Sequence, residues 1–296
     1  MTQGEVIYVN GDSFTEGIEI ADYMLTFPTT NFSLNQIRKS EYTNELIDSQ
    51  HLYFKNKEEF LQDNKEIARE IHTAQIENRW SSKLASILNK PVFNLSSQGG
   101  SSMYAIAFRT IADISELAQR GYKVTDAIIQ ITTHMRFSVF ANTVIEQEPF
   151  ASILGKRAYN LISGNTFTSD KKITTLLQTF FETETSEFNV YRWFHELYML
   201  KHTLQSMCPG IRVIFVDSVF YKTTLWRQGA DFEDLLKISR LEYNHILNFR
   251  KEFDENLELS MLDFVMPDEP LITNGLHFTQ EVHDRFAFAI AERYFS

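Results

Sequence analysis

Val6-Ile7-Tyr8-Val9-Asn10-Gly11-Asp12-Ser13-Phe14-Thr15 is the stretch that decides the fold of this chain. Its first four residues are β-branched or aromatic and largely apolar, which favours a strand buried on both faces. Polar residues follow at once, and Gly11 permits a sharp turn at the end of the strand. A Ser hydroxyl just beyond that turn lies at the carboxyl edge of the sheet, where open α/β sheets bind their ligands.

The rest of the chain alternates similar apolar runs with amphipathic helical patterns. Further strands are predicted at Val92–Leu95, Ala127–Ile131 and Val213–Val216, and helices at Trp80–Leu88, 101–120 and Tyr191–Met207. This alternation is typical of a mostly parallel sheet covered by helices. The predicted fold class is therefore a three-layer α/β/α sandwich.

At 296 residues, the chain is near the upper size of a single core, and we predict one domain over 1–296 with two insertions. The first, at about 30–70, is polar and is predicted to be helical. The second, at about 138–190, scatters polar residues and glycine among aromatic residues without one steady period. So many aromatic side chains must be buried against something, which predicts a substrate cap or a protein-binding surface outside the main sheet.

Composition excludes several classes of function. The formal net charge of −11, without a basic stripe, argues against a nucleic-acid partner. No apolar run approaches the ~18 residues of a membrane-spanning helix. The lone cysteine, Cys208, can form no intrachain disulfide and is expected to be a buried small side chain. No signal peptide is recognised, so we expect synthesis in a cytoplasm.

Three short blocks carry chemistry. They are Gly11-Asp12-Ser13-Phe14-Thr15, Asn94-Leu95-Ser96-Ser97-Gln98-Gly99-Gly100-Ser101 and Asn274-Gly275-Leu276-His277-Phe278. Taken singly, each has an ordinary structural interpretation: a helix cap, a glycine-containing loop and a loop histidine. Together they place a serine hydroxyl and a distant histidine imidazole where a sheet edge would collect them, as a nucleophile and base assembled in space require.

These blocks resemble those of the SGNH (GDSL) hydrolase family. The resemblance implies that Ser13 is the nucleophile and His277 the general base, and that the amides of Ser13 and Gly99 hold the oxyanion. It implies no metal and no organic cofactor. The family has Asp where this chain has Asn274, which orients an imidazole without charge, and Asp268 is an alternative partner if its loop folds back.

The block after the third strand also departs from the family. His134 takes the place of the asparagine that donates to the oxyanion, and Arg136 follows it as a candidate for binding an anionic substrate. Both residues also suit plain packing or pairing at the sheet edge. The blocks look most like those of the divergent SGNH-like proteins of tailed bacteriophages, so a virion-associated location is one expectation.

Two functions are left open. The first is a serine ester hydrolase acting by acyl transfer on a small ester or an acetylated glycan. The second is a component of a virion or another assembly, which has protein partners and keeps the fold while its triad has decayed.

Overall fold

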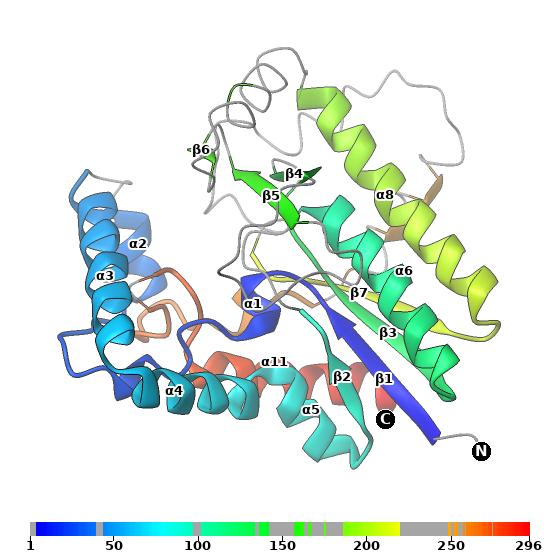
Figure 1. The fold of residues 1–296 in the computed structure, drawn as a ribbon, viewed down its shortest axis with the longest axis horizontal. Coiled ribbons are helices and arrows are strands. Elements are labelled where there is room, and N and C mark those ends of the chain that lie inside the picture. Colours follow the sequence, from blue (N-terminus) through cyan, green and yellow to red (C-terminus); the bar gives the residue numbers. More distant parts are fainter. Residues whose placement is uncertain are drawn as a thin grey trace. The chain divides into compact units, whose positions relative to one another are not determined.

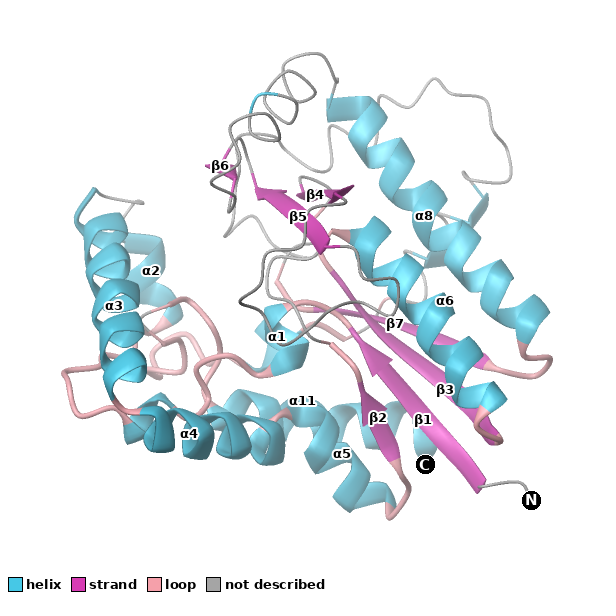
Figure 2. Cartoon of the chain, in the orientation of Figure 1, coloured by secondary structure: helices cyan, strands magenta, loops and turns pink. Residues whose placement is uncertain are grey.

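The computed structural model describes residues 4–39, 44–96, 102–133, 136–141, 157–162, 165–166, 175, 186–219, 248–249, 252–253, 257, 259–273 and 275–296. In chain order, the elements are β1 (Gly4–Asn10), α1 (Ser13–Glu16), η1 (Asp22–Met24), α2 (Leu34–Lys39), α3 (Asn44–Asp63), α4 (Lys65–Asn78), α5 (Trp80–Leu88), β2 (Val92–Asn94), α6 (Met103–Gln119), β3 (Tyr122–Ile131), β4 (Arg136–Ala141), β5 (Arg157–Ile162), β6 (Asn165–Thr166), α8 (Ser186–Met207), β7 (Arg212–Asp217), η2 (Met261–Phe264) and α11 (Gln280–Phe295). Figures 1 and 2 show these helices and strands.

The chain divides into two compact units. The first unit comprises Met1–Asp12 and Leu95–Glu258, and the second comprises Ser13–Asn94 and Leu259–Ser296. The main sheet has the strand order β2-β1-β3-β7. Its β1–β3 and β3–β7 pairs are parallel, so the α/β prediction is confirmed.

The core of the first unit follows from its sequence. Residues Val6–Val9 of β1 are at most 1% exposed, as expected for a strand covered on both faces. Helix α6 packs against β3 and α8. Its first turn is capped by Ser102, whose hydroxyl accepts a hydrogen bond from the Ala105 amide at 3.2 Å.

Part of the predicted second insertion forms regular structure. Strands β4, β5 and β6 make a separate antiparallel sheet. The sequence pattern names no strand in this stretch, yet 136–141 and 157–162 pair with each other, in a sheet separate from the main one. Hydrogen bonds between the backbones of neighbouring strands stabilise this sheet, although the side chains show no clear alternation of polar and apolar residues. Phe140 and Tyr159 lie on β4 and β5, while Phe150, Phe167, Phe180 and Phe181 lie outside the described residues.

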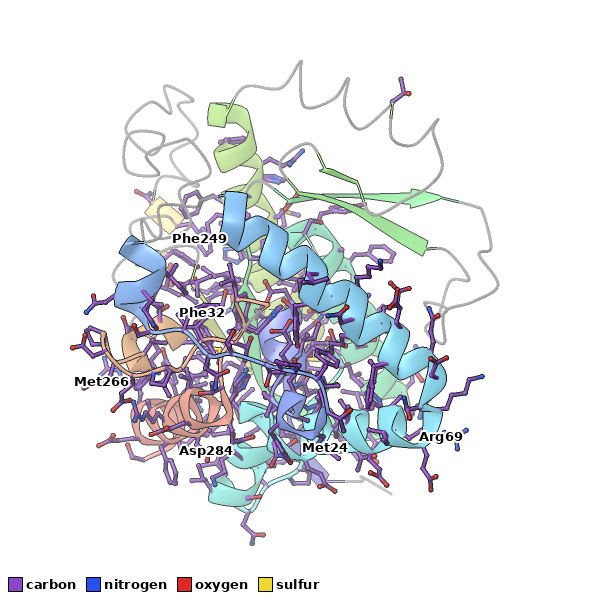
Figure 3. The ribbon with its side chains drawn as sticks, turned by 90° about the vertical axis from the view of Figure 1, so that its left-hand side faces the viewer. Met24, Phe32, Arg69, Phe249, Met266 and Asp284 are labelled. Carbon is purple, nitrogen blue, oxygen red and sulfur yellow. The ribbon has the colours of Figure 1, made fainter. Side chains whose placement is uncertain are left out.

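The second unit is mainly helical, and the prediction of helices at about 30–70 is confirmed by α2, α3 and α4. Helix α11 packs against α5, with the rings of Phe286 and Trp80 5.4 Å apart. The backbone N–H of Trp80, at the start of α5, donates to Nδ1 of the buried His283 at 3.2 Å. Arg69 of α4 and Met266 lie at the exposed outside of this unit (Figure 3).

The predicted elements of the main fold are confirmed. All four strands are present, although β3 begins earlier than predicted, at Tyr122. The predicted helices at 80–88, 101–120 and 191–207 correspond to α5, α6 and α8, and α8 begins at Ser186. Cys208 lies just after α8 and is a free thiol of intermediate exposure rather than fully buried.

Candidate active site

Ser13 is the first residue of α1, and only Gly11 and Asp12 separate it from the end of β1 at Asn10. Its carbonyl accepts hydrogen bonds from the amides of Gly17 at 3.1 Å and Ile18 at 3.2 Å, which close this short helix. A Cβ on Gly17 would lie 2.8 Å from Ile20 Cδ1, and Gly17 has a φ of +80°, so the turn after α1 requires glycine. Ser13 itself is only 5% exposed.

Asn94, at the end of β2, holds the backbone that follows Ser13. Its side-chain amide donates to the Thr15 carbonyl at 2.9 Å and to the Ser81 hydroxyl at 2.7 Å. The first residue of the second sequence block therefore fixes the first block in place.

The segment that carries His277 is a tight, internally bonded turn. The Thr273 amide donates to the His277 carbonyl at 2.8 Å, and the His277 amide donates back to the Thr273 hydroxyl at 3.1 Å. Isolated bridges join Ile272 to Phe32 and to Phe278 on either side. The imidazole of His277 packs on the ring of Phe14, the neighbour of Ser13, with the ring centroids 4.9 Å apart.

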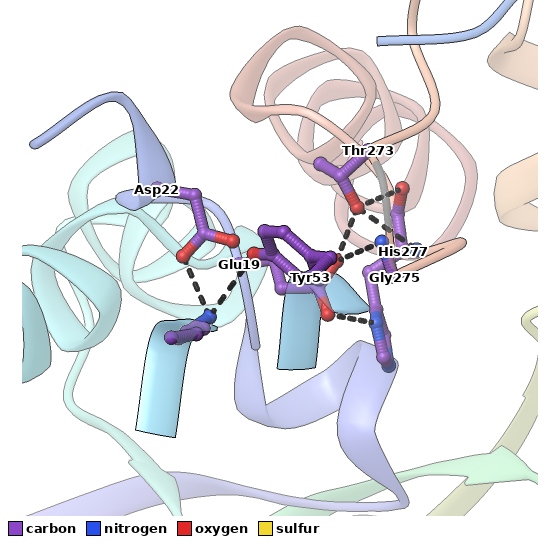
Figure 4. Close-up of polar contacts among 7 residues, drawn as sticks. Glu19, Asp22, Tyr53, Thr273, Gly275 and His277 are labelled. Atoms are coloured by element: carbon purple, nitrogen blue, oxygen red, sulfur yellow. Dashed lines mark hydrogen bonds and ion pairs between the residues drawn. The ribbon is translucent and has the colours of Figure 1, made fainter. Parts of the chain in front are cut away.

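Glu19 is the group that faces the His277 imidazole. Its Oε1 lies 3.2 Å from His277 Nδ1, within ion-pair distance, and neither atom has a hydrogen-bond partner among the residues that the structure describes. The other carboxylate oxygen, Oε2, accepts from the Thr273 hydroxyl and from the Gly275 amide, the latter at 3.1 Å (Figure 4). Since Nδ1 faces a carboxylate, Nε2 is left as the imidazole nitrogen that can take a proton from a nucleophile.

The Glu19 carboxylate is charged despite its burial. Glu19 is 1% exposed, and burial alone would raise its pKa. The facing His277 imidazole, the charge of Lys57 and the Thr273 hydroxyl together outweigh burial, so the pKa of Glu19 lies below its ordinary value. A buried carboxylate held next to a histidine is the electrostatic arrangement that stabilises an imidazolium.

The backbone around this pair is strained. Glu19 has a φ of +73° and Leu276 a φ of +65°, both in the left-handed region that non-glycine residues rarely adopt. A Cβ on Gly275 would lie 1.7 Å from Glu19 Oε1, so the approach of the carboxylate depends on glycine at this position.

The structure brings Ser13 and His277 into the same unit, connected through Phe14. Asn274, Gly99 and His134 lie outside the described residues. Arg136 begins β4, and its side chain is likewise outside the described part. Asp268, the alternative partner for His277, accepts a hydrogen bond from the Asn35 side chain at 2.8 Å.

Sequence reasoning missed Glu19. The available signal was a single charged residue between Ile18 and Ile20, within an apolar run that continues to Ala21. A carboxylate in such a run needs a partner when it is buried, because an unpaired buried charge is costly.

Two further features concern metals and membranes. Among the described residues, no group of three or more His, Cys, Asp or Glu side chains is arranged to hold a metal ion. Within the same part of the chain, no helix has both the length and the apolar character needed to cross a membrane.

No family model matches the sequence, and no curated protein matches it. Several solved structures are similar in part, among them three esterases. One is a carbohydrate esterase family 2 enzyme with a carbohydrate-binding domain from Corynascus thermopiles (Myceliophthora fergusii), 12% identical, with a TM-score of 0.47 and coverage of 98% of this chain. Another is the acetyl xylan esterase Est2A from the rumen bacterium Butyrivibrio proteoclasticus, 10% identical, with a TM-score of 0.38 and coverage of 99%.

The third is a carbohydrate esterase described as having divergent catalytic and non-catalytic binding functions, 10% identical, with a TM-score of 0.40 and coverage of 99% of this chain. The chain spans 66%, 63% and 64% of the length of these three proteins, in the order given.

Proposed function

We propose that this protein is a serine ester hydrolase of the SGNH kind, with Ser13 as nucleophile, His277 as general base and Glu19 as the acid that orients His277. The observation that carries the proposal is the 3.2 Å approach of the buried Glu19 carboxylate to His277 Nδ1. This contact supplies the charge that Asn274 lacks, and it leaves Nε2 available for the nucleophile.

The reaction proposed is acyl transfer in two steps. The Ser13 hydroxyl attacks the ester carbonyl while His277 takes its proton, and His277 then returns the proton to the departing alcohol. Water hydrolyses the acyl-enzyme by the same route and regenerates Ser13. The amides of Ser13 and Gly99, with the imidazole of His134, are the proposed oxyanion donors, and Arg136 is the proposed contact for an anionic substrate.

The proposed substrate is a small acetyl ester, with an acetylated glycan as its natural form. The 5% exposure of Ser13 supports a small acyl group, because a bulky one needs more open space at the nucleophile. No cofactor is part of the proposed reaction.

Labelling with a small fluorophosphonate, followed by mass mapping, tests the proposal. We expect one adduct, on Ser13, and its loss in Ser13→Ala and His277→Ala. Ser86→Ala, which changes an exposed hydroxyl bonded to the Ser82 carbonyl on α5, is the matched control and should label normally.

The same experiment separates the two functions left open by the sequence. If the folded protein takes no label, and if an acetyl ester is not hydrolysed, the esterase proposal fails. The alternative proposal, a fold kept as a component of a virion or other assembly, then takes its place.

A further inference from the structure

The inserted helix α3 contributes a buried cation next to the candidate site. Lys57 Nζ lies 2.7 Å from Asp22 Oδ1, with the two side chains 13% and 7% exposed. The same ammonium group lies 3.4 Å from the Tyr53 hydroxyl and 5.6 Å from the centre of the Tyr53 ring. Lysine is almost never buried without a partner, so this placement is a specific feature of the fold.

Asp22 and Glu19 belong to one turn. The Asp22 amide donates to the Glu19 carbonyl at 3.1 Å, and Asp22 begins η1. The ion pair with Lys57 therefore anchors the turn in which Glu19 holds its left-handed backbone conformation. Figure 4 shows the ion-paired Asp22 together with Glu19 and its contacts to the His277 segment.

We infer that Lys57 is a positioning residue for the Glu19–His277 pair: through its ion pair with Asp22 it fixes the turn that carries Glu19, and it adds a positive charge to the surroundings of that carboxylate. This inference rests on the proposed function and adds a role for helix α3, which the sequence predicts only as part of a polar helical insertion. Lys57 acts through Asp22 and Glu19 rather than on the substrate.

The charges around Glu19 are consistent with this role. His277 and Thr273 face the carboxylate from the segment before α11, and Lys57 contributes from α3. After His277, Lys57 is the next charge that lowers the pKa of Glu19. Burial raises the pKa of Asp22 to about 6 although Lys57 opposes the rise, with Glu19 and His277 as the other charges that act on it. The charge of His277 also lowers the pKa of the buried His283 of α11, to which burial contributes most.

The test is the titration of the Glu19 carboxyl, followed by NMR with selectively ¹³C-labelled glutamate and assigned by loss of the signal in Glu19→Gln. Lys57→Met should move the Glu19 titration to higher pH, because it removes a largely buried positive charge. Lys57→Arg should restore the parent value. Lys55→Met is the matched control, because Lys55 lies on the same helix with a 70% exposed side chain, and it should leave the titration unchanged.

A second variant guards against misfolding. Lys57→Met leaves Asp22 buried without its partner, whereas Lys57→Met/Asp22→Asn replaces the pair by neutral groups of similar size. An unchanged Glu19 titration in either variant, when folded, overturns the inference.

Ser13 labelling against pH gives the second measurement. In folded Lys57→Met and in the folded double variant, Ser13 should label more slowly than in the parent at every pH, and Lys57→Arg should restore the parent rate. If the parent protein takes no label, the proposed function fails, and the carboxyl titration still decides the role of Lys57.

Discussion

Replacing Glu19 by Gln should slow the acylation of Ser13 by about 10³ to 10⁴. Glu19→Gln keeps the size of the side chain and removes its charge. At a separation of 3.2 Å and an effective dielectric constant of about 20, a carboxylate and an imidazolium attract each other by about 5 kcal/mol. That energy corresponds to nearly four powers of ten in rate, similar to the roughly 10⁴ loss for an amide in the serine protease triad.

The assay is the second-order rate constant for fluorophosphonate labelling of Ser13, measured with Glu59→Gln as control. Glu59 is an exposed carboxylate that pairs only loosely with Lys55, at 3.8 Å, and its variant should react like the parent. In the Glu19→Gln variant, the new side-chain amide can also turn its NH₂ toward Nδ1, which favours the wrong tautomer of His277. A Glu19→Gln variant that is folded and labels within threefold of the parent would refute Glu19 as the orienting acid.

Three further outcomes are expected. Gly275→Ala should abolish labelling and cost about 1–3 kcal/mol in urea unfolding, because its Cβ would lie 1.7 Å from Glu19 Oε1. Asn274→Asp should change the labelling rate less than about threefold, since Glu19 already supplies the charge; a tenfold rise would assign the orienting role to Asn274. Burial lowers the pKa of His283 to about 3 from 6.5, so the unfolded state binds the extra proton between these values. The free energy of unfolding should therefore fall as pH drops from about 6.5 toward 3, by on the order of 4 kcal/mol, and His283→Gln should flatten that dependence.

The main sheet could be predicted from sequence because its signals are local. Residues Val6–Val9 are apolar because both faces of β1 are buried, and the periodicity of α6 reflects one buried face. Ser13 and His277 could be proposed from sequence because they stand at fixed places beside such elements. By contrast, β4 and β5 depend on pairing between two segments, which neither segment reveals by itself.

The contact between Glu19 and His277 could not be predicted, because nothing in the sequence links these two residues. The link is made by a left-handed turn after α1 and by the Thr273–His277 turn, two backbone shapes that hydrophobic patterns do not encode. The role inferred for Lys57 could not be predicted for the same reason, because it also depends on a contact between distant segments. A polar helix looks solvent-exposed in sequence, yet α3 buries the ammonium of Lys57 and exposes that of Lys55.

The strain at this pair bears on whether the site is active or decayed. Over the described residues, three non-glycine residues have a positive φ; Asn89 ends α5, and the other two are Glu19 and Leu276. Each such conformation costs on the order of 1–3 kcal/mol and persists only where its surroundings enforce it. A plain structural contact needs neither that strain nor a buried charge, because an apolar pair would fill the same space at lower cost. The arrangement of Glu19 and His277 therefore favours a working hydrolase over a scaffold, and labelling of Ser13 decides between them.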